Sequence, residues 1–186
     1  GKQFTYALLE ERAPQAKSLE RESALVELTR RYFKSHGPAT LQDFVWWSGL
    51  TTADARKGME AVQSEFEQET ITDQVYWFSA PTLTKISSPS VYLLPNYDEY
   101  TVGYRDRSAI FERKHIDKLS AFRESILTQV MVLNGQVSGT WKRTLKKNQV
   151  IMEFAPFTAL SKEQNRAVIA AAERYGGFLQ LPVVLV

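Results

Sequence analysis

The chain has 186 residues and no cysteine, which excludes disulfide bonds, thiolate metal sites and cysteine nucleophiles. Its hydrophobic content of 44% suffices for one large or two small cores, and no apolar run approaches the roughly 18 to 20 residues of a membrane span. The composition is that of an ordinary soluble protein, for which we expect a cytoplasmic location and no membrane partner. With only two histidines, it predicts no metal site and no other cofactor.

The net charge of +2 is unevenly distributed. Residues 1–100 hold 10 basic and 14 acidic side chains, residues 101–150 hold 10 and 4, and residues 151–186 hold three of each. Clustered Lys and Arg neutralise phosphates, so 101–150 is the best electrostatic candidate for contact with nucleic acid. A solvated sheet face with the same charges is an equally weighted alternative.

The first twenty residues predict a strand remnant and a linker. Residues 1–9 show a half-alternating pattern typical of a strand entered midway, and an initial Gly1 in place of Met indicates a tag remnant on a fragment of a longer protein. Residues 10–20 lack periodicity and contain Pro14, which favours a linker.

Residues 21–80 are expected to form a winged helix-turn-helix domain. Apolar residues recur at three- and four-residue spacing before Gly37-Pro38, which ends the first helix. A second helix runs to Gly49, and Thr51 is the capping residue of a third. Alternation with a period of two over 66–78, around a polar turn, predicts the hairpin wing.

Residues 90–186 are expected to form a β-rich, barrel-like antiparallel domain, which makes the whole chain α+β. Asn134-Gly135 is a strong hairpin signal, because both residues tolerate the positive φ of a type I′ turn. The flanking strands cover 127–133 and 136–143, and 149–154 is the next strand of a meander.

One or two helices are expected in this second domain. Ser161 and Gln164 form a capping box for a helix that we expect to end at Gly176-Gly177. Residues 115–122 favour another short helix, and 179–186 could form a final strand.

Three segments, in chain order, carry a family resemblance. They are Tyr32–Leu50, which ends in Trp46-Trp47-Ser48-Gly49-Leu50; Leu94–Arg107, which contains Tyr97-Asp98-Glu99-Tyr100; and Asn134–Arg143, which ends in Gly139-Thr140-Trp141-Lys142-Arg143. Together they resemble the bacterial winged-helix DNA glycosylases of the AlkZ type. The resemblance implies tandem winged helices, a C-terminal β-barrel-like domain, and excision of alkylated or crosslinked bases in DNA repair.

The sequence departs from that family at the catalytic signature. The family carries a Gln-x-Gln motif near the N-terminus of the full protein, and no Gln-x-Gln occurs here. The resemblance therefore implies a C-terminal portion without catalytic residues, whose partners are double-stranded DNA and a missing N-terminal domain. The alternative is a non-catalytic, regulator-like winged-helix module that binds DNA or protein.

The best basic patch begins next to Trp141 on a predicted strand. Alternate strand residues point to opposite faces, so Lys142 should face away from Trp141 and Arg143. A hairpin that interleaves an aromatic with cations is a plausible phosphate-binding element. The candidate DNA-binding residues of this part of the chain are Lys142, Arg143, Lys146, Lys147, Arg105 and Arg107.

The third helix offers Thr52, Arg56 and Lys57 as further candidate DNA contacts. The charges argue against a third helix that reads bases in a DNA groove. Residues 21–79 hold six basic and nine acidic side chains, and the hairpin wing carries only acidic charges. An acidic wing repels phosphate, so a packing role for this domain is favoured over DNA reading.

Asp98, Glu99 and Tyr100 belong to the densest polar cluster and could line a DNA-binding channel. Paired carboxylates can assist glycosidic chemistry, whereas a structural network with nearby Arg side chains is the favoured alternative. Trp46 and Trp47 lie about 100° apart on a helix, so one should be in the core while the other packs on a domain or stacks on a base.

Overall fold

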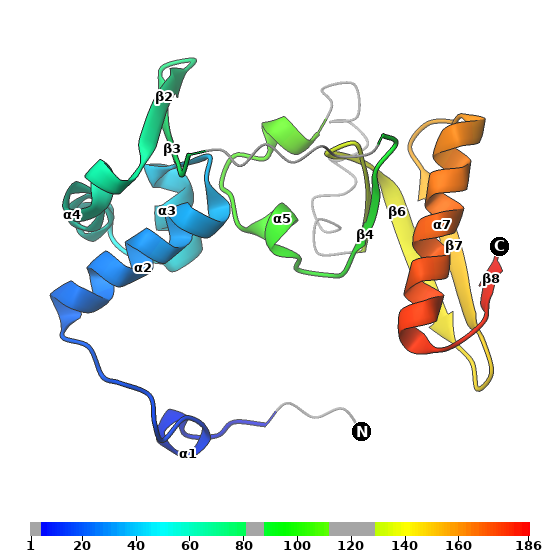
Figure 1. The fold of residues 1–186 in the computed structure, drawn as a ribbon, viewed down its shortest axis with the longest axis horizontal. Coiled ribbons are helices and arrows are strands. Elements are labelled where there is room, and N and C mark those ends of the chain that lie inside the picture. Colours follow the sequence, from blue (N-terminus) through cyan, green and yellow to red (C-terminus); the bar gives the residue numbers. More distant parts are fainter. Residues whose placement is uncertain (1–4, 81–87, 112–128) are drawn as a thin grey trace. The chain divides into compact units, whose positions relative to one another are not determined.

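The computed structural model describes residues 5–80, 88–111 and 129–186 (Figure 1). Contacts divide the chain into two compact units. The first unit holds residues 1–41 and 50–79, and the second holds 42–49 and 80–186. No helix within the described ranges is long and apolar enough to cross a bilayer.

The N-terminal segment does not form the expected strand where it is described. Residues 5–8 have no regular structure, and Leu9–Arg12 form the short helix α1. Tyr6 is 99% exposed. A strand needs a neighbour to pair its backbone N–H and C=O groups, and alternation alone does not supply one.

Two helices form the core of the first unit. Helix α2 (Arg21–His36) packs against α4 (Thr52–Val62), which is followed by the single turn η1 (Gln63–Glu65). The two helices approach closely at Gly58, where a Cβ atom would lie 3.3 Å from Leu25 Cγ. The expected cap of α4 is confirmed, since Thr51 Oγ1 accepts a hydrogen bond from the Asp54 N–H at 3.1 Å.

The predicted hairpin of the first unit is present. Strands β2 (Glu67–Ile71) and β3 (Gln74–Phe78) pair in antiparallel fashion, and β1 (Ala39–Thr40) adds to the other edge of β3. Thr72 and Asp73, which join β2 to β3, have φ values of 49° and 62°. This backbone matches the right-handed twist of the flanking strands.

The second unit is built on a five-stranded sheet in the order β4-β5-β6-β7-β8. The expected turn at Asn134-Gly135 is confirmed, with φ values of 49° and 79°. The strands are β4 (Val91–Leu94), β5 (Val130–Leu133), β6 (Gln136–Leu145), β7 (Val150–Pro156) and β8 (Val183–Leu185).

The expectation of a wholly antiparallel sheet is wrong at one pair, because β8 runs parallel to β7. The connection between them is helix α7 (Lys162–Leu179), and a crossover of this length returns the chain in the parallel direction. In the described ranges the sheet is open, with β4 and β8 at its edges, and forms no closed barrel.

Helix α7 begins where the sequence predicts and ends later. The capping box is confirmed, because Ser161 Oγ accepts from the Gln164 N–H and Gln164 Oε1 accepts from the Ser161 N–H. The expected end at Gly176-Gly177 is wrong, since the helix continues to Leu179 and stops at Gln180 in the left-handed conformation. Gly176 instead allows close packing, and a Cβ atom there would overlap Val183.

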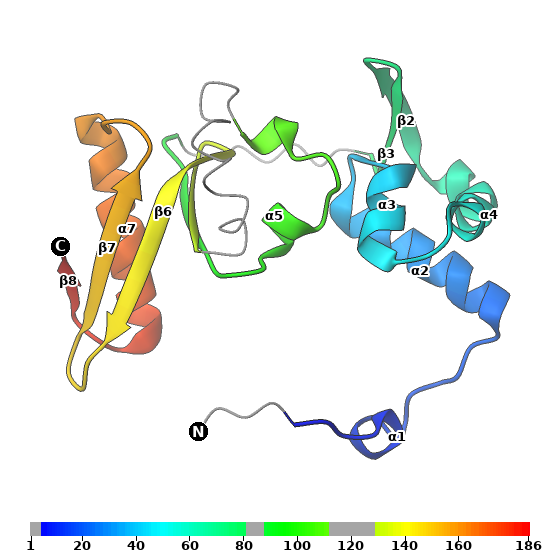
Figure 2. The same cartoon turned by 180° about the vertical axis from the view of Figure 1, so that it is seen from behind.

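The two faces of the sheet have different neighbours. Helix α7 covers one face, as the opposite views of Figures 1 and 2 show. On the other face the sheet packs against the segment that holds α5 (Glu99–Val102) and η2 (Ser108–Ile110). The short helix expected at 115–122 lies outside the described residues.

Candidate nucleic-acid interface

The Tyr-Asp-Glu-Tyr segment forms the start of α5. Asp98 is the N-cap, and its Oδ1 accepts a hydrogen bond from the Tyr100 N–H at 2.9 Å. The Tyr100 hydroxyl donates to the carbonyl of Gly135 at 2.6 Å, which ties α5 to the β5–β6 turn. Burial raises the pKa of the Tyr100 hydroxyl, so this group stays protonated and acts as a donor.

Helix α3 (Leu41–Ser48) carries the two adjacent tryptophans, and both hold the segment 98–107 of the same unit. The Trp46 indole N–H donates to the carbonyl of Val102, and the Trp47 indole N–H donates to Glu99 Oε2, each at 3.1 Å. Trp46 is 55% exposed, and neither ring is in the buried core. Glu99 is thus held by α3.

A buried carboxylate completes this contact. Asp43 is 3% exposed, and its Oδ1 accepts hydrogen bonds from the backbone N–H groups of Arg105 at 2.9 Å and Asp106 at 3.3 Å. This role was not predicted from the sequence. The available signal was that Asp43 is the only charged residue of α3, because a buried charge needs donors nearby.

The side chains of Arg105 and Arg107, which both lie on this loop, differ in exposure and in their contacts. Arg105 is exposed, and its Nη1 donates to Gln42 Oε1 at 3.0 Å. The Arg107 guanidinium lies 5.6 Å from the centre of the Trp46 ring, and burial lowers the pKa of Arg107. Arg105 is therefore the more accessible of these two candidate phosphate contacts.

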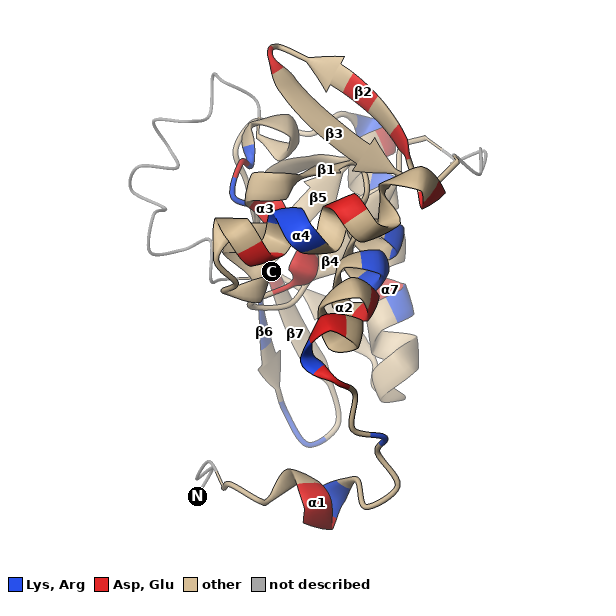
Figure 3. Cartoon of the chain, turned by 90° about the vertical axis from the view of Figure 1, so that its left-hand side faces the viewer, with Lys and Arg blue, Asp and Glu red and all other residues tan. Residues whose placement is uncertain are grey.

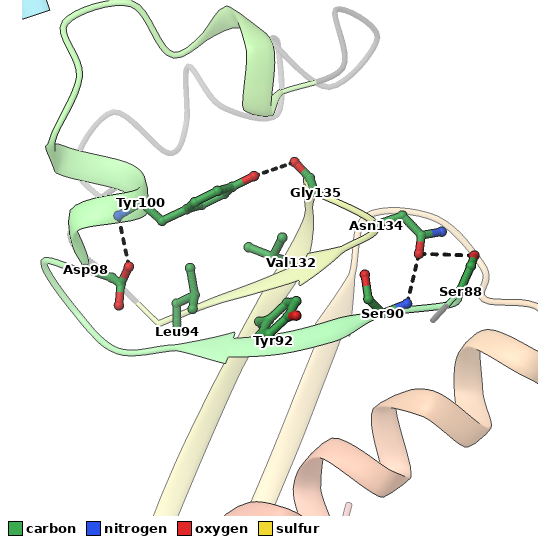
Figure 4. A pocket seen from close by; sticks show the side chains of 9 residues that line it. All are labelled: Ser88, Ser90, Tyr92, Leu94, Asp98, Tyr100, Val132, Asn134 and Gly135. Atoms are coloured by element: carbon green, nitrogen blue, oxygen red, sulfur yellow. Dashed lines mark hydrogen bonds between the residues drawn. The ribbon is translucent and has the colours of Figure 1, made fainter. Parts of the chain in front are cut away.

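A pocket of about 770 Å³ opens on the sheet face opposite α7 (Figure 4). Leu94 and Val132 come from the sheet, and Tyr92 and Tyr100 lie on either side of them in this view. Asp98 and Tyr100 are the two predicted channel residues that reach this pocket, and Glu99 is not among its lining residues. The remaining lining residues are Ser88, Ser90, Asn134 and Gly135.

The β6–β7 hairpin presents four cations. Trp141 is buried beneath α7, Lys142 points to the opposite face across from Glu153, and the Arg143 guanidinium lies 5.3 Å from the centre of the Tyr175 ring. The predicted alternation is thus observed. Lys146 and Lys147 lie at the exposed tip, where Figure 3 shows a blue turn. Within the described ranges no ion pair engages these four cations.

In the first unit, by contrast, most Lys and Arg side chains form ion pairs. Residues 21–79 are all described, and five of their six Lys and Arg side chains form ion pairs with Asp or Glu. Lys57 pairs with Glu22 at 3.2 Å, while Arg56 and Thr52 are exposed on α4. The other paired cations are Arg21, Arg30, Arg31 and Lys34.

We find no candidate metal site among the described residues. They contain no group of three or more His, Asp or Glu side chains that could hold an ion. The described polar features are a loop with Arg105 and Arg107 whose backbone is held by Asp43, a pocket with two tyrosines, and an exposed cationic hairpin.

The fold is that of an α+β protein. The family model described as "DNA glycosylase AlkZ-like" matches residues 1–178, so the chain belongs to the AlkZ-like DNA glycosylase family. A comparison with curated protein sequences finds no match.

Among solved structures, the fold is similar to that of the DNA glycosylase AlkZ of Streptomyces sahachiroi, with a TM-score of 0.65 and 20% sequence identity. The match covers 92% of this chain and 48% of that protein. The chain therefore spans about half the length of this relative, and at this identity the likeness concerns the fold.

Proposed function

We propose that this chain supplies scaffold and duplex-binding surface for a DNA-repair glycosylase that excises alkylated or crosslinked bases. The observation that supports this most is the contrast between the two sets of cations. Lys142, Arg143, Lys146 and Lys147 are exposed and outside any ion pair in the described ranges, whereas the first unit neutralises most of its own. Unpaired surface cations release counterions from DNA when they bind phosphates.

Residues 21–80 form, in this proposal, a winged helix that packs rather than reads DNA. The order α2, α3, α4 and hairpin supports the winged helix. Its wing is acidic, as the red segments of β2 in Figure 3 show, and Lys57 on the third helix is already paired. Like charges repel, so this surface disfavours close approach to phosphate.

We assign no catalytic residue within this chain. No Gln-x-Gln occurs in its 186 residues, and the carboxylates Asp98 and Glu99 serve as a helix cap and as the acceptor for Trp47. Base excision is therefore proposed for the whole protein, with a further N-terminal domain as partner. Its cytoplasmic location stays a prediction.

The salt dependence of duplex binding tests this proposal. Log affinity falls with log salt by about 0.9 for each phosphate that a protein neutralises. Replacing three hairpin cations, Lys142→Gln, Lys146→Gln and Lys147→Gln, should reduce that slope by about 2 to 3 and weaken binding. Fluorescence anisotropy of a labelled duplex at several salt concentrations measures both quantities.

The matched control replaces two cations of the first unit, Arg56→Gln and Lys57→Gln. We expect this variant to keep the slope of the unmodified chain, because the acidic wing of the same unit disfavours phosphate near Arg56 and Lys57 already has an acidic partner. The opposite pattern, a slope that depends on α4 and not on the hairpin, would show that the third helix reads DNA and would contradict the proposal.

A further inference from the structure

Strand β4 is an unpaired edge of the sheet in the second unit. Directly before it, the carbonyl of Ser90 accepts a hydrogen bond from the Asn134 N–H at 3.0 Å. Backbone groups alternate in direction along an antiparallel strand, so Val91 and Leu93 direct their N–H and C=O groups away from β5. In the described ranges no other strand pairs with β4, and β4 has no charged residue that would discourage pairing. Such an edge can accept a further strand.

Helix α7 forms a groove along this edge (Figure 1). The groove has a volume of about 380 Å³ and lies between the start of β4 and the α7 residues Ala167, Ala170 and Arg174. Val91 is 4% exposed and packs against α7, so the helix lies close to the edge. Phe178, one turn beyond Arg174 on the helix, is 83% exposed and offers an apolar contact. An edge strand beside side-chain pockets is where extended peptides bind by strand addition.

Arg174 supplies the charge of the groove. Its Nη2 donates to the carbonyl of Val91 at 3.2 Å, which holds the guanidinium at the edge of the sheet. Arg174 is exposed, and it is the one charged side chain among the described lining residues. In the described ranges no ion pair engages it. A guanidinium has five N–H donors and pairs well with a carboxylate. The groove therefore suits an extended backbone that carries a carboxylate.

We propose that this groove binds an extended peptide segment of a partner protein, which adds a strand to β4 and places a carboxylate on Arg174. The outward N–H groups of Val91 and Leu93 and the carbonyl of Leu93 match the alternating acceptors and donors of such a backbone. A phosphate backbone offers acceptors only and would leave the Leu93 carbonyl unpaired. This inference goes beyond the proposed duplex binding, which depends on the β6–β7 hairpin.

The experiment titrates the 186-residue chain with three labelled peptides that share an alternating Val-Thr core. The first has a Glu side chain and an amidated end, the second has Gln and a free terminal carboxylate, and the third has Gln and an amidated end. We expect at least one of the first two to bind at least about fivefold tighter than the third, because charge-assisted hydrogen bonds are the stronger ones. Fluorescence anisotropy measures the affinities and distinguishes a side-chain carboxylate from a chain end.

Nuclear magnetic resonance identifies the edge that the peptide uses. The backbone amide signals of Val91 and Leu93 should shift and become protected from hydrogen exchange when the peptide is added. The amides of Val183 and Leu185 in β8, at the opposite edge, are the control and should not change. A peptide that is N-methylated throughout its core should not bind, because it has no N–H group to donate to the Leu93 carbonyl.

Variants of α7 test the chemistry of the groove. Arg174→Gln should remove the preference for a carboxylate, and Arg174→Lys should keep most of it, since the charge is retained. Arg166→Gln is the matched control, because it removes an exposed arginine of α7 that does not line the groove. Ala170→Leu should fill the groove and weaken binding of all three peptides, and circular dichroism checks that the helix is retained.

Three results would overturn the proposal. They are a failure of all three peptides to bind, a carboxylate preference that survives Arg174→Gln, and peptide binding without a response at Val91 and Leu93. A lower salt slope of duplex binding in Arg174→Gln, with peptide binding unchanged, would assign the groove to DNA and would also overturn it. The duplex-binding proposal is tested separately by the hairpin variants.

Discussion

At the scale of residues, the second unit depends on a buried acceptor. Asp43 satisfies two backbone N–H groups in the loop that carries Arg105 and Arg107. Because Asp43 is 3% exposed, water does not replace it readily. A single carboxylate on α3 therefore sets the course of a loop more than 60 residues later in the sequence.

We expect Asp43→Ala to destabilise the second unit by roughly 1–3 kcal/mol, the usual cost of leaving buried donors unpaired. Asp43→Asn keeps an acceptor oxygen and should lose less. Chemical denaturation measures the change in the free energy of unfolding, and hydrogen exchange of the backbone amides of residues 98–107 measures the local effect on the loop. Glu60→Ala, an exposed residue on α4, is the control and should change stability by about 0.5 kcal/mol or less. A loss for Asp43→Ala no larger than that control would contradict this role.

Two glycines in helices provide a second residue-scale test. At Gly58 a Cβ atom would overlap the Thr29 hydroxyl, and at Gly177 it would meet nothing within 4 Å. Gly58→Ala should destabilise the packing of α2 on α4 by about 1–3 kcal/mol, whereas Gly177→Ala should stabilise α7 by about 0.5–1 kcal/mol. Hydrogen exchange in α2 and α7 separates the two effects, and a gain at both sites would disprove the close contact at Gly58.

At the scale of elements, ion pairs connect α2 to η1. The carboxylate of Glu65 accepts hydrogen bonds from Arg30 Nε and Nη2, and Glu27 accepts from both Arg30 and Arg31. The Arg side chains lower the pKa of Glu65 and of Glu27. All four groups reach solvent, so salt screens them and each pair contributes modestly.

This network predicts sensitivity to acid. Because the pKa of both carboxyls is lower in the folded than in the unfolded chain, their contribution is fully present above the ordinary value of 4.5. It is lost as the pH falls through the lowered folded values. Thermal unfolding from pH 7 to pH 3 should show this decline, and Glu65→Gln should make it shallower. Glu67→Gln, in the neighbouring strand, should leave the profile unchanged; an equal effect of both variants would contradict the network.

At the scale of the whole molecule, the two units divide their charges differently. In the first, acidic partners engage most cations; in the second, the hairpin cations and the pocket remain available on the surface. The duplex-binding experiment tests this division directly. It changes the hairpin and α4 separately, so the contribution of each unit can be measured on its own.

Local patterns in the sequence determined most elements of the structure. The caps at Thr51 and Ser161, the turn at Asn134-Gly135 and the strand alternation around Trp141 each depend on a few neighbouring residues, and all are observed. The family was equally readable, because its motifs are contiguous segments and the family model matches the same chain.

Only the tertiary structure decided what each element meets. The parallel β8, the continuation of α7 past Gly176, and the absence of a strand at 5–8 all depend on distant partners. So does the site: Asp43 reaches the loop at 105–106, and residues from β4, β5 and α5 meet at the pocket. Sequence patterns encode propensity and periodicity, whereas burial and pairing arise between segments far apart in the chain, and those contacts select which polar groups stay free to bind.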